Sequence, residues 1–375
     1  MTITNRTTPT HDAALPPVPR GWRVAHDFCY VLGGAERVSA LLAREGAVDG
    51  PVVALGGRPE VFHDAGVESV EIRYPRTFGE RHYRQLSLAV PMLSRFARPV
   101  EGNLLASSYA FSHHLRATGR TVVYCHSPLR QVWSGADMYV DHVPGPARRA
   151  ARLAIGRLRD ADRRAAHRAA AYVANSAAVA DRIRRYYGIE PAAVVHPPVD
   201  AHFRRYDLPR EDHYVWAGRI VEPYKRLGAV LEAFRAHPGR RLVVVGDGRD
   251  APRLRATAPP NVRFVGPLGT AEVARAYATA RAVIFPSEDD FGLVPVEAMA
   301  CGTPVVALGR GGALETVVDG VTGVLFGEPT PAALNRALAR FEAAAWDEGA
   351  IARYAEESFG RPHFIRVMRD VLASV

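Results

Sequence analysis

Short apolar runs rich in β-branched residues alternate with alanine-rich segments of helical periodicity along most of this chain. This alternation is typical of β-α-β units, whose parallel strands must be covered by helices on both faces of the sheet. A polar, proline-marked stretch over residues 199–212 interrupts the alternation, which then starts again. The chain therefore predicts an α/β fold with two Rossmann-like, doubly wound parallel-sheet domains, whose ligands would lie at the carboxyl ends of the strands.

The domain boundaries follow from the same pattern. The chain of 375 residues is longer than a usual single domain, and each half is long enough to bury a core. We predict a disordered tail over 1–20, a first domain over 21–198, a linker over 199–212 and a second domain over 213–358. The amphipathic final segment, 359–375, is expected to join the first domain.

The individual elements are predicted from the apolar runs and their periodicity. In the first half we predict strands at 22–26, 51–55, 70–72, 103–106, 121–125, 171–174 and 193–196. In the second half we predict strands at 214–217, 242–245, 262–265, 282–285, 304–307 and 324–326. Helices are predicted to start near Ala35, Tyr83, Arg148, Ala177 and Arg361, and after Lys225, Ala251, Thr270, Pro295, Ala313 and Pro331.

The composition narrows the class of protein and its partners. With 48% hydrophobic and 23% charged residues, a disordered or fibrous chain is excluded. The net charge of +9 suits a nucleic acid, an anionic membrane surface or a phosphorylated small molecule. Eight arginines between residues 148 and 168 accompany only Asp160 and Asp162, so this stretch is either a solvated helix face or a peripheral membrane contact. No RNA-binding motif or zinc-finger spacing supports a nucleic-acid surface.

Targeting signals are not evident in the sequence. Residues 1–20 lack the basic start and continuous apolar run of a secretory signal, and no apolar run approaches the ~18 residues of a membrane span. The three cysteines are far apart, which fits a reducing compartment. We expect a cytoplasmic protein.

Lys225 is the only lysine of the chain, although lysine and arginine together number 48. It follows a predicted strand and the pair Gly218-Arg219, just ahead of a helix. Lysine is a compact, flexible charge, whereas arginine is a planar fork, so the two are not interchangeable where a phosphate is bound. Arg219 and Lys225 could converge on a diphosphate, or they could be surface residues in ordinary ion pairs.

A second strand-to-helix turn, residues 285–297, offers an anion site. Gly292 would allow a diphosphate to approach the backbone, and the free amides of Leu293 and Val294 would point at it. The carboxylates of residues 288–290 would repel that anion, so we assign them to hydroxyls or to a cationic partner. Glu297, expected in the first helical turn, could accept from a ribose diol or simply complement the helix dipole.

Other glycine turns and one histidine are weaker candidates. Gly34 follows a predicted strand and suits close approach by a ligand. Gly246 also follows a strand, but its turn lacks the third glycine of a dinucleotide fingerprint, so we interpret it as a structural turn that borders the nucleotide. The turn 309–312 is more simply conformational. His126 ends an apolar strand and is either a hydrogen-bonding core residue or a substrate contact. No zinc spacing accompanies it, and the Asp160-Ala-Asp162 sequence lies inside a helix, so no metal site is predicted.

Taken together, these stretches resemble retaining glycosyltransferase family 4, with motif wording similar to its polysaccharide mannosyltransferases. The resemblance rests on six stretches. In chain order they are Gly-Gly-Ala-Glu (33–36), His-Ser-Pro-Leu-Arg (126–130), Asn-Ser (175–176), Gly-Arg with Pro-Tyr-Lys-Arg (218–226), Gly-Asp-Gly (246–248) and the long stretch that starts at Phe285 (285–303). It implies the GT-B architecture, in which two Rossmann-like domains face each other across a cleft. It also implies transfer from a nucleotide-sugar donor with retention and without a metal or other cofactor.

The resemblance implies a role for each matching residue. Arg219 and Lys225 would hold the diphosphate, Glu297 the ribose hydroxyls, and His126 the donor hexose. The backbone near Phe291, Gly292, Leu293 and Val294 would serve the phosphates and the sugar, with contributions from Gly34, Gly218 and Gly246. The family has a glutamate eight positions before Glu297, where this chain has Asp289 beside Glu288, so either carboxylate could take that role.

We therefore predict a glycosyltransferase that moves a hexose, with mannose from GDP-mannose as the favoured donor, to a hydroxyl acceptor. The acceptor could be a saccharide, a lipid-linked glycan or a small natural product. A nucleotide-sugar epimerase of the same fold and a catalytically silent scaffold subunit are the alternatives. The donor base, the acceptor, the linkage position and the oligomeric state are not legible in the sequence.

Overall fold

The structure is a computed structural model that describes residues 21–46, 50–74, 89–136, 140 and 145–375. The predicted disordered tail and the helix expected near Tyr83 lie outside these residues. The chain divides into two compact units: residues 1–196 together with 364–375 form one, and 197–363 form the other. No helix of the described residues is long and apolar enough to cross a membrane.

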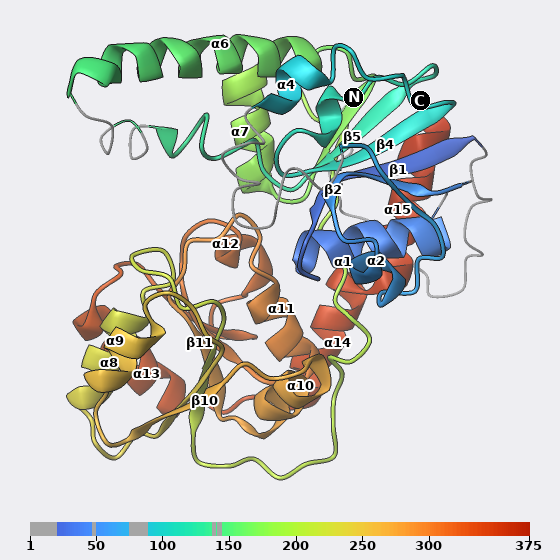
Figure 1. Cartoon of the computed structure of the whole chain (residues 1–375). Coiled ribbons are helices and arrows are strands. Elements are labelled where there is room, and N and C mark those ends of the chain that lie inside the picture. Colours follow the sequence, from blue (N-terminus) through green and yellow to red (C-terminus); the bar gives the residue numbers. More distant parts are fainter. Residues whose placement is uncertain (1–20, 47–49, 75–88, 137–139, 141–144) are drawn as a thin grey trace. The chain divides into compact units, whose positions relative to one another are not determined.

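The first unit is built on a seven-stranded parallel sheet in the order β3-β2-β1-β4-β5-β6-β7, of which Figure 1 labels β2, β1, β4 and β5. Because β2 and β4 lie on opposite sides of β1, the strand order reverses between β1 and β4, which is where ligands bind in sheets of this kind. The strands are β1 (Trp22–Cys29), β2 (Val52–Gly57), β3 (Val70–Ile72), β4 (Asn103–Ser108), β5 (Thr121–Cys125), β6 (Ala171–Ala174) and β7 (Ala193–Val194).

Helices cover both faces of this sheet. Tyr124 of β5 packs in one core cluster with Phe364 of the C-terminal helix, whereas its neighbour Val123 packs in the opposite cluster with Ile183. This alternation is the period of two of a strand buried on both faces. The helical segments are α1 (Gly34–Leu41), the π-helical η1 (Leu42–Gly46), α2 (Glu60–His63), α4 (Val90–Leu93), the 3-10 turns η3 (Ser112–His114) and η4 (Gly145–Ala147), α6 (Arg148–Ala166), α7 (Ala177–Tyr187) and α15 (Arg361–Ser374).

The second unit repeats the plan with six parallel strands in the order β10-β9-β8-β11-β12-β13. The order reverses between β8 and β11. The strands are β8 (Tyr214–Ala217), β9 (Leu242–Val245), β10 (Val262–Gly266), β11 (Ala282–Phe285), β12 (Val305–Leu308) and β13 (Gly323–Phe326). The helices are α8 (Leu227–Arg235), α9 (Ala251–Ala256), α10 (Thr270–Thr279), α11 (Leu293–Ala300), α12 (Ala313–Thr316), α13 (Pro331–Glu342) and α14 (Glu348–Phe359).

The α/β fold with two parallel sheets is confirmed, and every predicted strand is present with some shift of its ends. The predicted start of the helix after Pro295 is wrong, because α11 begins at Leu293 behind the left-handed Gly292. Glu297 is consequently the fifth helical residue and lies in the second turn. Sequence patterns did not predict α2, α4 or α14; the first two have four residues each, too few to display a helical period.

The loop after β4 is held by a buried carboxylate on the neighbouring strand. Asp27 of β1 has no exposed surface and accepts hydrogen bonds from four consecutive backbone amides, those of residues 109–112, at 2.5–2.8 Å. Each amide donates to one of the two carboxylate oxygens, so the charge of Asp27 is balanced by backbone dipoles. The loop at the switch point of the first sheet is fixed in this way.

We expect Asp27→Asn to lower the local stability of this loop by about 2 kcal/mol or more, because two acceptor positions are replaced by an amide donor that faces backbone N–H groups. Hydrogen exchange of the 109–112 segment, followed by mass spectrometry, measures the change. Asp64→Asn, at an exposed carboxylate, is the control and should stay within about 0.5 kcal/mol of the wild type. Equal protection in both variants would contradict the proposed role of Asp27.

Candidate functional site

The two loops that flank the switch point of the second sheet are joined by cations. Lys225, in the loop after β8, donates from Nζ to Oδ2 of Asp289, in the loop after β11, at 2.5 Å. The adjacent Arg226 donates from Nη1 to the carbonyl oxygen of Pro286 at 3.2 Å. The Lys225 and Asp289 side chains are 25% and 28% exposed, so the pair remains accessible from solvent. The only lysine of the chain therefore lies where a doubly wound sheet binds its ligands.

Arg219 lies in the same loop as Lys225. Its side chain is exposed and forms no hydrogen bond or ion pair with any residue that the structure describes. The preceding Gly218 has a φ of 151°, and a Cβ on Gly246 would come within 2.0 Å of the Gly218 carbonyl oxygen. These two glycines let the loops after β8 and β9 approach each other closely. The backbone conformation of Gly218 and the close contact at Gly246 are enough to require glycine at both positions, without any ligand.

The amino end of α11 also lies beside the switch point. Gly292 adopts a φ of 81° at the N-cap, and the ring of Phe285 would be 2.8 Å from a Cβ at this position. The first amides of the helix, those of Leu293 and Val294, have no intrahelical acceptor and are the groups that bind anions at helix N-termini. Phe291 is 3% exposed and packs against Phe359, so its side chain belongs to the core and only its backbone could serve a ligand.

Glu297 lies one turn further along α11, partly buried. Burial and then the charge of Glu297 raise the pKa of Tyr277 well above its ordinary value and that of Cys301 to about 12. The position of Glu297 in the second turn weakens its reading as a dipole-complementing acid, because that effect is confined to the first turn.

The glycine turn 309–312 supports the β11 loop. The amide of Gly312 donates to the carbonyl oxygen of Asp289 at 3.0 Å, and a Cβ at Gly312 would lie 2.0 Å from the Phe291 carbonyl oxygen. A Cβ on Gly311 would come within 3.5 Å of Cγ of Glu288. Glu288, in the loop after β11, is exposed, whereas Asp289 is the carboxylate that contacts Lys225. The structure thus brings Asp289, and not Glu288, to the lysine.

In the first unit, His126 is joined to the α1 region by a line of polar side chains. His126 Nε2 is 2.8 Å from Ser107 Oγ, which is 2.7 Å from Ser39 Oγ. Ser39 Oγ is 2.8 Å from Nδ1 of His26, and Nε2 of His26 is 3.4 Å from Oε1 of Glu36. Four of these five residues are buried, so the orientation of the His126 ring is fixed from behind by protein groups. Sequence reasoning missed this network, although a histidine inside the apolar strand β1 was a visible signal.

Gly34, the other residue predicted from the first unit, is the first residue of α1, and Gly33 is its N-cap. The side chain of Glu36 turns back to accept from the amide of Gly33 at 3.0 Å through Oε2. The same carboxylate is the end of the line that reaches His126. The Gly-Gly-Ala-Glu turn and the His-Ser-Pro turn, far apart in sequence, are therefore connected inside this unit.

Burial, and then the charge of the neighbouring His26, lower the pKa of His126 to about 3. Imidazole is consequently neutral in the folded protein at every pH above that value. A neutral ring offers one donor and one acceptor nitrogen, which suits contact with a sugar hydroxyl.

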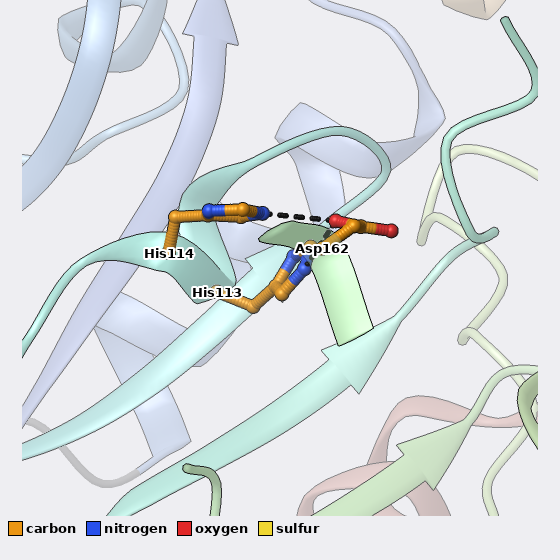
Figure 2. Close-up of side chains that lie close together, drawn as sticks. All are labelled: His113, His114 and Asp162. Carbon is orange, nitrogen blue, oxygen red and sulfur yellow. Dashed lines mark hydrogen bonds and ion pairs between the residues drawn. The ribbon is translucent and has the colours of Figure 1, made fainter. Parts of the chain in front are cut away.

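A second buried cluster in this unit was also missed. Asp162 of α6 accepts on Oδ1 from Nε2 of His113 and of His114, each at 2.9 Å (Figure 2). Its Oδ2 accepts from Nε1 of Trp133 at 2.7 Å and from the hydroxyl of Tyr187 at 2.8 Å. Asp162 is fully buried, so it is not part of the solvated helix face suggested by the arginines around it. The signal in the sequence was its spacing of three and four residues from the buried Ala165 and Ala166.

His113, His114 and Asp162 form the one group among the described residues with the types and spacing of metal ligands, and their candidate ligand atoms lie within 4.8 Å of one another. Burial raises the pKa of Asp162, yet the charges and hydrogen bonds of His113 and His114 outweigh it and hold the pKa far below its ordinary value. The four side chains that donate to it, His113, His114, Trp133 and Tyr187, already satisfy the ionised carboxylate of Asp162. The cluster is therefore explained as a hydrogen-bonded centre that ties η3, α6 and α7 together.

Comparison of the sequence with protein-family models identifies the family of this chain. The model described as Glycosyltransferase Family 4 matches residues 32–203, and the model described as Glycosyl transferases group 1 matches residues 211–343. The chain belongs to glycosyltransferase family 4. The two matches follow one another along the chain and fall on the two parallel sheets.

Curated relatives of this family 4 chain match it over less than half of its length. A D-inositol 3-phosphate glycosyltransferase from Segniliparus rotundus is 38% identical over 180 residues, 41% of this chain and 40% of the relative. A protein of the same name from Mycobacterium bovis is 37% identical over 179 residues, 41% of this chain and 37% of the relative. The chain thus spans about two fifths of the length of these relatives.

Solved structures match over nearly the whole family 4 chain and show its GT-B fold. HepE from Anabaena, in complex with UDP, has a TM-score of 0.68 at 19% identity and covers 94% of this chain and 100% of its own. The lipopolysaccharide outer core galactosyltransferase WaaB, in its apo form, has a TM-score of 0.64 at 15% identity, with the same coverage of 94% and 100%.

Because His126 is neutral in the folded protein, we predict that the free energy of unfolding decreases as the pH is lowered. Its folded pKa of about 3 lies below the ~6.5 of an unfolded histidine, so on acidification the unfolded chain takes up a proton that the folded chain does not. Stability is then lost as pH falls below ~6.5, by up to about 1.4 kcal/mol per pH unit for this group. We expect His126→Asn to flatten the decline, measured by pulse proteolysis in urea between about pH 7 and pH 5. A variant that keeps the full wild-type decline would contradict this assignment.

Proposed function

We propose that this protein is a retaining, metal-independent glycosyltransferase that moves a hexose from a nucleotide sugar to a hydroxyl acceptor. The observation that carries the proposal is the ion pair between Lys225 and Asp289, which joins the loop after β8, where Arg219 also lies, to the loop that leads into α11 at the switch point of the second sheet. Its family membership agrees with this reading.

The chemistry of the site follows from where negative charge develops. When the bond between the sugar and the diphosphate breaks, the diphosphate gains charge, and preorganised cations and amides stabilise that charge more than they stabilise the bound donor. Lys225, Arg219 and the first amides of α11 would supply this stabilisation. Asp289 holds the Lys225 ammonium at 2.5 Å and would pass from this ion pair to a donor hydroxyl when phosphate takes its place.

The remaining predicted residues would bind the rest of the donor. Glu297 on α11 would accept from the ribose diol, and His126 of the first unit would contact the hexose, as the family resemblance implies. Retention is explained by attack of the acceptor on the face that the diphosphate leaves, with a phosphate oxygen taking the acceptor proton. The acceptor would be a saccharide, a lipid-linked glycan or a small natural product, and residues 148–168 would supply a peripheral membrane contact to a cytoplasmic protein.

Two observations point to different donors. The motif wording of residues 218–226 and 285–297 resembles mannosyltransferases and favours GDP-mannose. HepE, at 19% identity, was solved in complex with UDP and with UDP-glucose, which favours a UDP-hexose. We retain mannose from GDP-mannose as the proposal, with UDP-glucose as its competitor.

The donor is identified by thermal shift with matched panels of GDP, UDP and ADP sugars, because a ligand that binds only the native state raises its melting temperature. We expect GDP-mannose to give the largest shift. A larger shift with a UDP-hexose would replace the proposed donor, and no shift with any nucleotide sugar would remove the transferase proposal. Incubation with labelled donor alone tests the epimerase alternative, which predicts isomerisation without an acceptor.

Lys225→Arg keeps the positive charge but replaces a compact, flexible ammonium by a planar fork with fixed donor directions. We expect kcat to fall about a hundredfold, as when one preorganised charge stabiliser is lost, with an unchanged melting temperature. Steady-state transfer with the donor found above provides the measurement. Arg263→Lys, at an exposed position of β10, is the control. Normal turnover by Lys225→Arg would show that the site needs only the charge.

A further inference from the structure

Four arginines line a cavity of about 240 Å³ in the first unit. Arg95 follows α4, Arg116 follows η3, Arg164 is in the last turn of α6, and Arg168 lies just beyond that helix. The ring of His114 is part of the same wall. Among the residues that the structure describes, no carboxylate lines this cavity, and its four arginines, all exposed, come from three segments.

These arginines are not neutralised by acids. None of the four forms an ion pair with a residue in the described part of the chain, whereas other arginines do so, as Arg240 does with Glu342 at 2.8 Å. A shallower neighbouring hollow shares Arg164 and Arg168 and contains one exposed carboxylate, Asp160. Among the described residues, the four arginines around the cavity therefore outnumber the acids near it, which are the exposed Asp160 and the buried Asp162 behind His114.

Backbone carbonyls hold two of the guanidinium groups in place. Arg168 donates from Nη2 to the carbonyl oxygen of His114 at 3.1 Å, and Arg116 donates to that of Arg95 at 3.4 Å. The His114 ring is in turn fixed by Asp162, which is the buried centre shown in Figure 2. A carbonyl orients a guanidinium without neutralising it, so Arg116 and Arg168 keep their positive charge on this exposed surface. Burial, followed by the charges of Arg116 and Arg95, lowers the pKa of Arg168, although Tyr172 opposes this.

The cavity lies at the opposite edge of the sheet from the residues described above. Arg116 and Arg168 precede β5 and β6, and a bridge between Val100 and Ala117 lies ahead of β4. The amino ends of parallel strands share one edge, while Ser107 and His126 mark the carboxyl edge of the same strands. Any ligand of the arginines is thus separate from a sugar bound at the carboxyl ends.

We propose that Arg95, Arg116, Arg164 and Arg168 form a second ligand site, which binds a small phosphate-type oxyanion. Arginine binds phosphate through paired N–H donors, and an anion here would relieve the repulsion among four like charges. The volume is below the ~300–1,000 Å³ of pockets that enclose drug-sized ligands, which favours a phosphate or the phosphate head of a larger molecule over a whole nucleotide. The phosphate could be free or belong to a lipid headgroup.

The test is a thermal-shift titration of the full chain with inorganic phosphate and with pyrophosphate at constant ionic strength. We expect saturable stabilisation that is reduced at least severalfold in Arg116→Gln and in Arg164→Gln. The second variant removes no hydrogen bond found in the described residues, so it tests binding even if Arg116→Gln folds poorly. Arg185→Gln, at an exposed position of α7, is the matched control and should titrate like the wild type.

Vesicle sedimentation distinguishes the two sources of phosphate. Vesicles of phosphatidylcholine are compared with vesicles of phosphatidylcholine and phosphatidylglycerol in equal parts, using the same four proteins. Binding only to the anionic vesicles, lost in Arg116→Gln and Arg164→Gln, supports the site with a lipid headgroup as its ligand. Saturable binding of the free anions, lost in the same variants, supports it with a soluble ligand. If neither probe binds, or if all four proteins respond equally, the proposed site is overturned.

Discussion

Parallel strands have to be covered on both faces, because their connections are helices that return over the sheet, and this constraint decides where polar chemistry can lie in each unit. The faces of both sheets are filled by apolar clusters such as those around Tyr124 and Phe234. Only the strand ends remain for charged groups. Lys225, Asp289 and the amino end of α11 all lie at one such edge, beside the reversal of strand order between β8 and β11.

Charge that does enter the first unit is balanced locally. Asp27 is balanced by four backbone amides, and Asp162 by two histidines, a tryptophan and a tyrosine. A buried carboxylate left unpaired would cost several kcal/mol, so each of these centres fixes the segments that supply its donors. The four arginines around the cavity are exposed and differ from these centres, because none of them forms an ion pair with a described residue, and this is why we assign an anionic ligand there.

The predictability of the site differed from residue to residue. The turn at Gly292 could be predicted as a ligand-binding turn because a strand, a glycine and an apolar segment follow one another in sequence, although the helix starts at Leu293 and not after Pro295. The carboxylate partner of Lys225 could not be chosen from sequence, since Asp289 and Glu288 are adjacent and only the path of the loop decides which one reaches the ammonium. The chain of hydrogen-bonding side chains from Glu36 to His126 joins segments about 90 residues apart in the sequence, and no local sequence pattern indicates such a contact.

Sequence patterns were enough to predict two sheets of parallel strands and the turns at which ligand-binding groups occur, because hydrophobic period and turn chemistry are local properties. They did not determine which side chains meet. The pairing of Lys225 with Asp289, the burial of Asp162 and the convergence of four arginines depend on segments distant in sequence. Those contacts are set by how helices pack on the sheets, where a rotation of one helix by a single residue would exchange a buried partner for an exposed one.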